Sequence, residues 1–567
     1  MWAPASRART ARPQVTEMSS ADVVPLLRRA WAALQQGQPA PAKADCEAAL
    51  QQAPQSFDAW RLYAMTLQAL GDAAASRRAL QRALALRPDD GATALDLGTM
   101  QLNAGEFDAA LASLALAMQR LPHEPRAAFR YGTAAFNAGD YVQAASGFET
   151  AARLKPDWAE AWNNLAAAHG KQQDYVAAIS AARNALQLNP DAGAHQALAA
   201  LLSNLFDRTS LQEGLQHALR ALQLDPSLAQ AHRDAAILYR KLDDPTGAEA
   251  HARRALELAP RDIDIIDTLG EQLQLNRKPH EAVDVYARAL HAGVDSPTLH
   301  RQHGIALLHD GRLDAARDEL RDALRRAPDD QRTIAHLGVA VAQHDADRAT
   351  QWLGLHRHVH AIELPTPDGF ADAHAFNAAL ADDIRRHSQQ RWEPAGLAAR
   401  NAYLSGDLLM DRTPAIVGFE QRLREAIDAF IAQARDAHVA EAPLDDDALS
   451  ADVFLRNVPE RYRVHVWATQ AAERGFIDTH IHEDSWLSGA YYVELPPAIR
   501  DDDNTHAGWI EFGRPFASLP QPPDAALRRV CPKVGTLLLF PSYLFHRTLP
   551  YAGAGERISI SFDLAAI

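Results

Sequence analysis

The stretch AEAWNNLAAAHGKQQDYVAAISAARNALQLNPD, residues 159–191, is one copy of a unit that recurs along the first three-fifths of the chain. Its closing proline belongs to a series with a constant step of 34 residues, formed by Pro54, Pro88, Pro122, Pro156 and Pro190. After a slip of two residues the series resumes at Pro226 and Pro260, and it returns at Pro328. A fixed period of this length indicates an array of structural repeats rather than one compact core.

Each unit is predicted to be a pair of helices. Small residues recur at fixed places, so that Gly98, Gly105, Ala110 and Ala117 of one unit correspond to Gly132, Gly139, Ala144 and Ala151 of the next. Small side chains let two helices approach closely. The proline ends the second helix because it has no N–H to donate and its ring clashes within a helix.

This period and pattern resemble the tetratricopeptide repeat over about residues 24–350. The resemblance implies an all-α superhelix whose concave face binds a protein or a peptide. A helical array that serves only as a spacer is the alternative. We therefore expect a repeat domain over residues 20–350, preceded by a disordered tail over residues 1–19.

Composition and charge limit the classes of partner. Hydrophobic residues make up 47% of the chain and charged residues 23%, as in ordinary soluble proteins, and no apolar run approaches the roughly 20 residues of a membrane helix. The net charge of −15 argues against a nucleic-acid partner, because phosphate neutralisation needs a basic face. Cys46 and Cys531 form no pair motif, which favours the reducing cytoplasm as the location.

The repeat pattern ends near residue 350, and residues 351–567 are predicted to form a second domain. Residues 369–387 and 418–438 carry apolar residues at steps of three and four, which predicts helices. From about residue 453 the period changes to two, and a β-barrel core is expected over residues 453–567. The predicted strands are RVHVWATQ (463–470), FIDTHIH (476–482), LSGAYYVEL (487–495), GWIEFG (508–513), GTLLLFP (535–541) and RISISFDLA (557–565).

Side chains that can bind a metal gather in this second domain. His480, His482 and Asp484 stand at every second position, just before the predicted strand 487–495. Residues i and i+2 of a strand point to the same side, so two of these three could bind one metal ion. A distant histidine, His546, follows the predicted strand 535–541.

The motifs HIH, SGAYY, FPSYLFH and RISISF follow one another in this order. Over about 200 residues they resemble the Fe(II)/2-oxoglutarate-dependent dioxygenases, and more narrowly a bacterial group of 2-oxoglutarate/iron oxygenases that are often fused to tetratricopeptide repeats. The resemblance implies a double-stranded β-helix, or jelly-roll, domain with flanking helices. It also implies an oxidoreductase of the prolyl-hydroxylase type that uses Fe(II), 2-oxoglutarate and O2.

The same resemblance assigns roles to individual residues. Iron would be held by His546 and by one of two pairs of neighbouring residues. In the first frame the pair is His480 and His482, and in the second frame it is His482 and Asp484. The first frame is favoured, because His480 then stands the expected distance before Tyr492. Arg557 would bind the far carboxylate of 2-oxoglutarate, because its planar fork matches a carboxylate, and Ser559 and Tyr492 would assist.

Two alternatives stay open. One is a non-catalytic repeat scaffold whose barrel is degenerate, and the other is a cupin-like metal protein that does not use 2-oxoglutarate. Arg557 and Ser559 argue against the cupin-like alternative, because that chemistry has no need for a carboxylate clamp.

Overall fold

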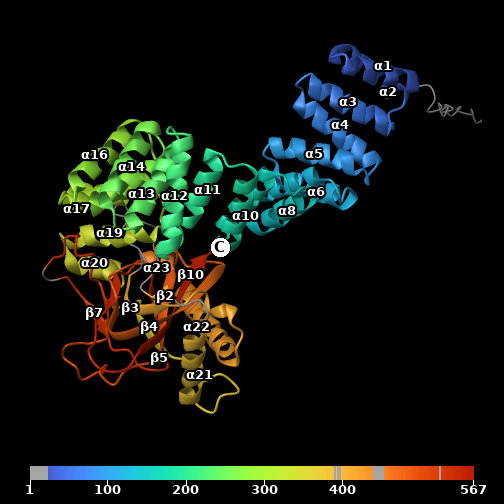
Figure 1. The fold of residues 1–567 in the computed structure, drawn as a ribbon. Helices are drawn as coiled ribbons and strands as arrows, with labels where there is room; N and C mark the ends of the chain where they lie inside the picture. Colours follow the sequence, from blue (N-terminus) through green and yellow to red (C-terminus); the bar gives the residue numbers. More distant parts are fainter. Residues whose placement is uncertain (1–22, 388–390, 393–397, 439–451, 523–524) are drawn as a thin grey trace, which may run out of the picture. The chain divides into compact units, whose positions relative to one another are not determined.

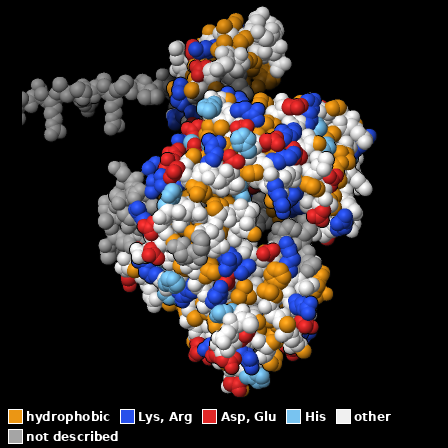
Figure 2. Space-filling view, turned by 90° about the vertical axis from the view of Figure 1, so that its left-hand side faces the viewer, with side chains coloured by type: hydrophobic (Ala, Val, Ile, Leu, Met, Phe, Trp, Pro, Cys, Tyr) orange, Lys and Arg blue, Asp and Glu red, His pale blue; other side chains and the backbone are white. Residues whose placement is uncertain are grey.

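The computed structural model describes residues 23–387, 391–392, 398–438, 452–522 and 525–567, so the predicted tail over residues 1–19 lies outside the described residues. The chain folds as two compact units, residues 1–204 and 205–567 (Figure 1). No described helix combines the length and the apolar character that crossing a bilayer requires. Figure 2 shows acidic and basic side chains interspersed over the described part of one face of the molecule.

The first unit consists of helices that pack in sequence order. They are α1 (Val24–Gln35), α2 (Pro39–Gln52), α3 (Phe57–Ala69), α4 (Ala73–Leu86), α5 (Gly91–Asn103), α6 (Phe107–Arg120), α7 (Pro125–Asn137), α8 (Tyr141–Leu154), α9 (Ala159–Lys171), α10 (Tyr175–Leu188) and α11 (Ala192–Leu202). Helices α2, α4, α6, α8 and α10 each end two residues before a proline of the 34-residue series. The predicted helix pairs are therefore confirmed, with proline as the stop signal.

Two glycines show why small residues recur in the repeats. A Cβ atom added to Gly98 would lie 2.5 Å from Leu114 Cγ, and one added to Gly132 would lie 2.8 Å from Phe148 Cδ1. A side chain at either place would force the paired helices apart. Gly105 serves differently: its φ of 76° is a left-handed conformation, which glycine adopts without steric cost, in the turn between α5 and α6.

The second unit begins with further repeat helices. They are α12 (Arg208–Leu224), α13 (Ala229–Lys241), α14 (Pro245–Leu258), α15 (Ile263–Leu275), α16 (Pro279–His291), α17 (Pro297–His309), α18 (Leu313–Arg326), α19 (Gln331–Ala342) and α20 (Ala346–Trp352). Helices α12, α14 and α18 again end two residues before Pro226, Pro260 and Pro328.

Two antiparallel sheets follow in the same unit. The larger has the strand order β1-β8-β5-β10-β4-β3-β2, and the smaller has the order β7-β6-β9. The strands are β1 (His360–Glu363), β2 (Arg391–Trp392), β3 (Ala399–Leu404), β4 (Tyr462–Ile477), β5 (Leu487–Glu494), β6 (Ile510–Phe512), β7 (Arg528–Val530), β8 (Thr536–Pro541), β9 (His546–Thr548) and β10 (Arg557–Ala566). The sheets thus also include strands from before residue 453.

Helices α21 (Ala373–Arg386), α22 (Pro414–His438) and α23 (Val453–Arg456) and the short 3₁₀ helix η1 (Leu408–Met410) accompany the sheets. The indole ring of Trp486, just before β5, stacks on Phe454 of α23 with a centroid distance of 4.5 Å. Apolar side chains of the sheets and of these helices form one continuous core with the last repeat helices. The predicted fold class, helical repeats followed by an antiparallel β domain with flanking helices, is confirmed.

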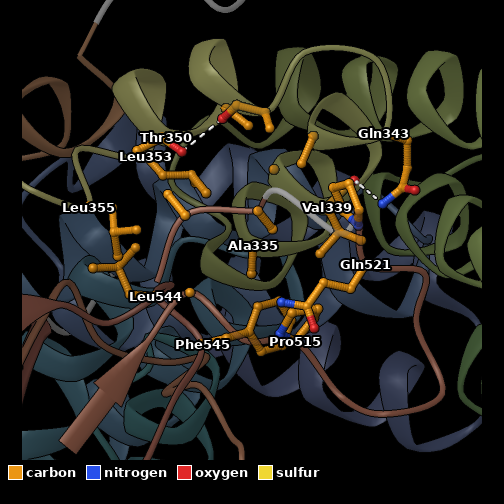
Figure 3. A pocket seen from close by; sticks show the side chains of 18 of the residues that line it. Ala335, Val339, Gln343, Thr350, Leu353, Leu355, Pro515, Gln521, Leu544 and Phe545 are labelled. Atoms are coloured by element: carbon orange, nitrogen blue, oxygen red, sulfur yellow. Dashed lines mark hydrogen bonds between the residues drawn. The ribbon is translucent and has the colours of Figure 1, made fainter. Parts of the chain in front are cut away.

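The last repeats pack directly on the β domain. A small apolar hollow of about 60 Å³ lies between α19 and α20 on one side and the segments after β6 and before β9 on the other (Figure 3). At its edges the Tyr543 hydroxyl donates to the carbonyl of Leu353 at 3.0 Å, and the Gln343 amide donates to the carbonyl of Pro520 at 3.1 Å. The Tyr543 contact holds the turn that leads into β9, and the Gln343 contact holds the segment between β6 and β7.

Candidate functional site

Three histidines meet where the two sheets face each other. His480 and His482 lie in the segment between β4 and β5, and His546 is the first residue of β9. One ring nitrogen from each lies within 4.8 Å of those of the other two. The backbones of His480 and His546 exchange two N–H···O hydrogen bonds of 3.1 Å, which hold the two segments together.

The predicted strand over residues 476–482 is shorter in the structure, because β4 ends at Ile477. Beyond this point the chain pairs with the segment that leads from β8 into β9. The backbone N–H of His482 donates to the carbonyl of Ser542 at 3.1 Å, next to the bridge between His480 and His546. The two histidines thus meet His546 from a short bridged segment rather than from a regular strand.

The Nδ1 atom of each of the three rings forms a hydrogen bond. His480 Nδ1 lies 2.8 Å from the carbonyl of Asp478, and His546 Nδ1 lies 2.9 Å from that of Leu544. His482 Nδ1 lies 2.8 Å from the Asp563 carboxylate. These partners only accept hydrogen bonds, so each Nδ1 carries a proton, and in a neutral ring Nε2 then keeps its lone pair. Such outer partners fix the tautomer and orientation of metal-binding histidines.

Burial keeps two of these rings neutral. It lowers the pKa of His480 to about 4, with a further lowering by the neighbouring His482. Burial also lowers the pKa of His546 well below its usual value, and His480 and His482 add to that shift. Neutral imidazole is the form that binds a metal ion, so both rings are ready to do so at neutral pH.

The structure places Asp484 apart from this cluster. Its side chain is exposed, and it lines a different hollow together with Glu483, Arg301 and Arg332. Within that hollow the Glu483 carboxylate lies 3.5 Å from Arg332 of α19. Among the described residues, the group that could hold a metal ion contains His480, His482 and His546 without Asp484.

The three histidines share one cavity of about 400 Å³ with the other predicted residues, Tyr492, Arg557 and Ser559. Arg557 is the first residue of β10 and is only 1% exposed. Its Nη2 atom donates to the Thr548 hydroxyl at 3.0 Å, whereas its buried Nη1 atom has no hydrogen-bond partner among the described residues. Burying a cation with an unused hydrogen-bond donor costs free energy unless an anion binds to it.

Burial also shifts the pKa values of Arg557 and Tyr492. It lowers the pKa of Arg557, although Tyr492 and Tyr551 oppose that shift, and it raises the pKa of Tyr492. Tyr492 therefore keeps its phenolic proton at neutral pH, and it can donate a hydrogen bond to a ligand.

Comparison with protein families gives a match for each part of the chain. Residues 465–563, which include all the candidate ligands, match the family described as "Putative 2OG-Fe(II) oxygenase". Residues 33–99, 95–157, 159–192 and 270–331 match tetratricopeptide repeat families. The chain carries tetratricopeptide repeats and a C-terminal 2OG-Fe(II) oxygenase domain. A search among curated proteins found no match.

Several solved structures of repeat proteins are similar to parts of the chain. A tetratricopeptide repeat protein from Parabacteroides merdae is 16% identical, with a TM-score of 0.37 over 45% of this chain and 99% of that one. YrrB, a TPR protein with an unusual peptide-binding site, is 20% identical, with a TM-score of 0.30 over 34% and 97%. MamA from Desulfovibrio magneticus RS-1 is 19% identical, with a TM-score of 0.28 over 30% and 96%.

Asp563 of the oxygenase domain is a site residue that the sequence analysis missed. Besides His482 Nδ1, its carboxylate accepts a hydrogen bond of 2.6 Å from the Ser488 hydroxyl. A signal was present, because Asp563 lies six residues after Arg557 and four after Ser559. Alternate residues of a strand face the same side, so Asp563 lies on the same side of β10 as Arg557 and Ser559.

Replacing Asp563 with alanine is expected to weaken metal binding about 10- to 100-fold, as is usual when an outer partner of a metal ligand is removed. Asp563→Asn keeps an acceptor for His482 Nδ1 but removes the charge, so its loss should be smaller. Titration of Co(II) or Fe(II) without oxygen measures both variants. Equal affinity in the wild type and Asp563→Ala would show that Asp563 does not support the metal site.

Proposed function

We propose that the oxygenase domain is a dioxygenase of the hydroxylase type, which binds Fe(II) through His480, His482 and His546 and uses 2-oxoglutarate and O2. The observation that carries this proposal is the unpaired, buried Nη1 of Arg557 in the cavity that also contains the three histidines. A guanidinium in such a place fits the far carboxylate of 2-oxoglutarate.

The three histidines fit a first-row metal ion. Imidazole nitrogen suits iron, and three ligands on one side leave other positions open for the cosubstrate and oxygen. The usual site of this class has two histidines and one carboxylate. Here Asp563 forms a hydrogen bond with His482, and the group that could hold iron consists of three neutral side chains, so we expect weaker iron binding than in the usual triad.

The far end of the cavity fits 2-oxoglutarate. Arg557 and Ser559 lie two residues apart on β10, so both face the cavity, and Tyr492 of β5 is paired with Ser559 in the sheet. The guanidinium offers charge-assisted hydrogen bonds to a carboxylate, and the two hydroxyl groups offer further donors. When bound, Fe(II) would supply the chemistry for C–H hydroxylation, with O2 as the oxidant and 2-oxoglutarate as the co-reductant. The chain contributes ligands, orientation and a pocket shielded from water.

The repeats are proposed to bind the protein or peptide that is oxidised. Tetratricopeptide arrays offer an extended concave surface, which is suited to an extended polypeptide. We propose the cytoplasm as the site of action, because Cys46 and Cys531 lie far apart in the sequence and form no pair motif.

Succinate formation tests the proposed activity. Wild-type protein supplied with Fe(II), 2-oxoglutarate and air is expected to convert 2-oxoglutarate to succinate above the level of a control treated with a metal chelator. Protein that contains iron but forms no succinate at millimolar 2-oxoglutarate would favour the non-catalytic scaffold.

The two ligand frames can be separated by two alanine variants. His480→Ala is expected to lose tight iron binding, because it removes one of three converging nitrogens, whereas Asp484→Ala should keep it, because Asp484 is exposed outside the cluster. Anaerobic Fe(II) titration gives the stoichiometry of both. The opposite pattern, iron lost in Asp484→Ala and kept in His480→Ala, would show that the second frame is the correct one.

A further inference from the structure

The cavity of the three histidines continues into a larger hollow on its outer side. Ala398, His480, Ile481 and Arg547 line both spaces, so the two meet beside the proposed iron ligands. The outer hollow has a volume of about 990 Å³ and reaches Leu275 at the end of repeat helix α15. A path therefore runs from the repeats to the proposed metal site.

Arg547 stands at the junction of the two spaces. It follows His546 in β9, and its Nε and Nη2 atoms lie 2.9 and 2.8 Å from the same oxygen of Glu511. The charged side chains lining the inner cavity, within the described part of the chain, are Arg547 and Arg557, with no carboxylate among them. Because Arg557 is assigned to 2-oxoglutarate, Arg547 is the cation that is left for the substrate.

Glu511 does not neutralise the arginines around it. Its buried carboxylate accepts hydrogen bonds from Arg514 Nε at 2.7 Å and Arg529 Nε at 2.8 Å in addition to those of Arg547. Three guanidinium groups share one carboxylate, which leaves a formal charge of +2. These contacts hold the side chain of Arg547 in place. Burial alone would raise the pKa of Glu511, but the arginines lower it by a larger amount, so the carboxylate stays charged at neutral pH.

The outer hollow also contains acidic groups. Asp478 and Glu483 line it together with Arg400, Arg514 and Arg547. Glu483 is occupied by Arg332 of α19, at 3.5 Å. Glu483 is therefore already paired with a cation of the repeats.

We propose that the substrate is a peptide segment with an anionic side chain, a carboxylate or a phosphate, which pairs with Arg547 next to the oxidised residue. This inference rests on the proposed function. A hollow of this size between a repeat helix and the barrel admits an extended chain. A guanidinium that is already oriented by a buried carboxylate loses little freedom when it binds an anion.

Degenerate peptide pools that differ in one fixed central residue test the proposal. The pools carry glutamate, phosphoserine, glutamine or lysine, and their binding to full-length protein loaded with Fe(II) and 2-oxoglutarate is followed without oxygen by fluorescence anisotropy. The glutamate or the phosphoserine pool is expected to bind about 10- to 100-fold more tightly than the lysine pool, as one charge-assisted hydrogen bond would give. The tighter of the two anionic pools identifies the anion.

Arg529→Gln is the matched control for Arg547→Gln, because both arginines contact Glu511 but Arg529 lines neither hollow. Arg547→Gln should reduce the preference for the anionic pools to about twofold or less, and Arg529→Gln should keep it. Equal binding of all pools, no binding of any pool, or the same loss in both variants would overturn the proposal. The same samples are assayed for 2-oxoglutarate binding. Absence of 2-oxoglutarate binding would count against the proposed function, whereas binding of 2-oxoglutarate without a preference for the anionic pools would count against this inference alone.

Discussion

Replacement of His546 with alanine is expected to abolish stoichiometric iron binding, from about one Fe(II) per chain to none. His546 is buried, it supplies one of three converging nitrogens, and its backbone pairs with that of His480. Removal of an outer partner alone usually weakens a metal site 10- to 100-fold, and removal of a ligand costs more. Elemental analysis after anaerobic loading with Fe(II) measures the effect.

His374→Ala is the matched control, because His374 lies exposed on helix α21 of the same domain, outside the cluster. This variant should bind iron as the wild type does. Circular dichroism of both variants shows whether the fold survives. Full iron binding in a folded His546→Ala variant would contradict the assignment of the metal site.

Replacement of Arg557 with alanine is expected to weaken 2-oxoglutarate binding about 10- to a few hundred-fold. The guanidinium is buried, so a hydrogen bond to a carboxylate there should contribute about 1.5–3 kcal/mol, and more if the pair is bidentate. At about 1.4 kcal/mol for each factor of ten, this range gives the expected loss. Calorimetry without oxygen, with Fe(II) bound, measures the affinity.

Iron binding should survive in Arg557→Ala, because Arg557 is not among the converging metal ligands. Arg557→Lys should lie between the wild type and Arg557→Ala, since a point charge attracts a carboxylate but cannot form the two-pronged contact. A cupin-like protein would show no 2-oxoglutarate binding that depends on Arg557. Unchanged affinity in Arg557→Ala would therefore remove the support for the cosubstrate site.

The helical repeats could be predicted from the sequence because their signals are local. Each proline of the 34-residue series acts on the helix just before it, and each recurring glycine acts within its own helix pair. The order of the motifs around His480, His546 and Arg557 also indicated which side chains meet. The structure brings all three into one cavity.

The supporting contacts could not be predicted in the same way, because they join residues that are far apart in the sequence. Asp563 reaches His482 across 81 residues, and Arg547 reaches Glu511 across 36. Strand β1 precedes the region of alternating residues, and it pairs with β8 through backbone hydrogen bonds that leave little trace in its side chains. Such pairings depend on how the strands fold together rather than on local patterns.

Binding of 2-oxoglutarate to the Fe(II) form of the wild-type protein in the absence of oxygen tests the central claim most directly. Titration can be followed by the charge-transfer absorption or by the heat of binding. The three histidines and Arg557 predict saturable binding of one 2-oxoglutarate per iron. Absence of saturable binding at millimolar 2-oxoglutarate, in protein shown to contain iron, would contradict the dioxygenase proposal.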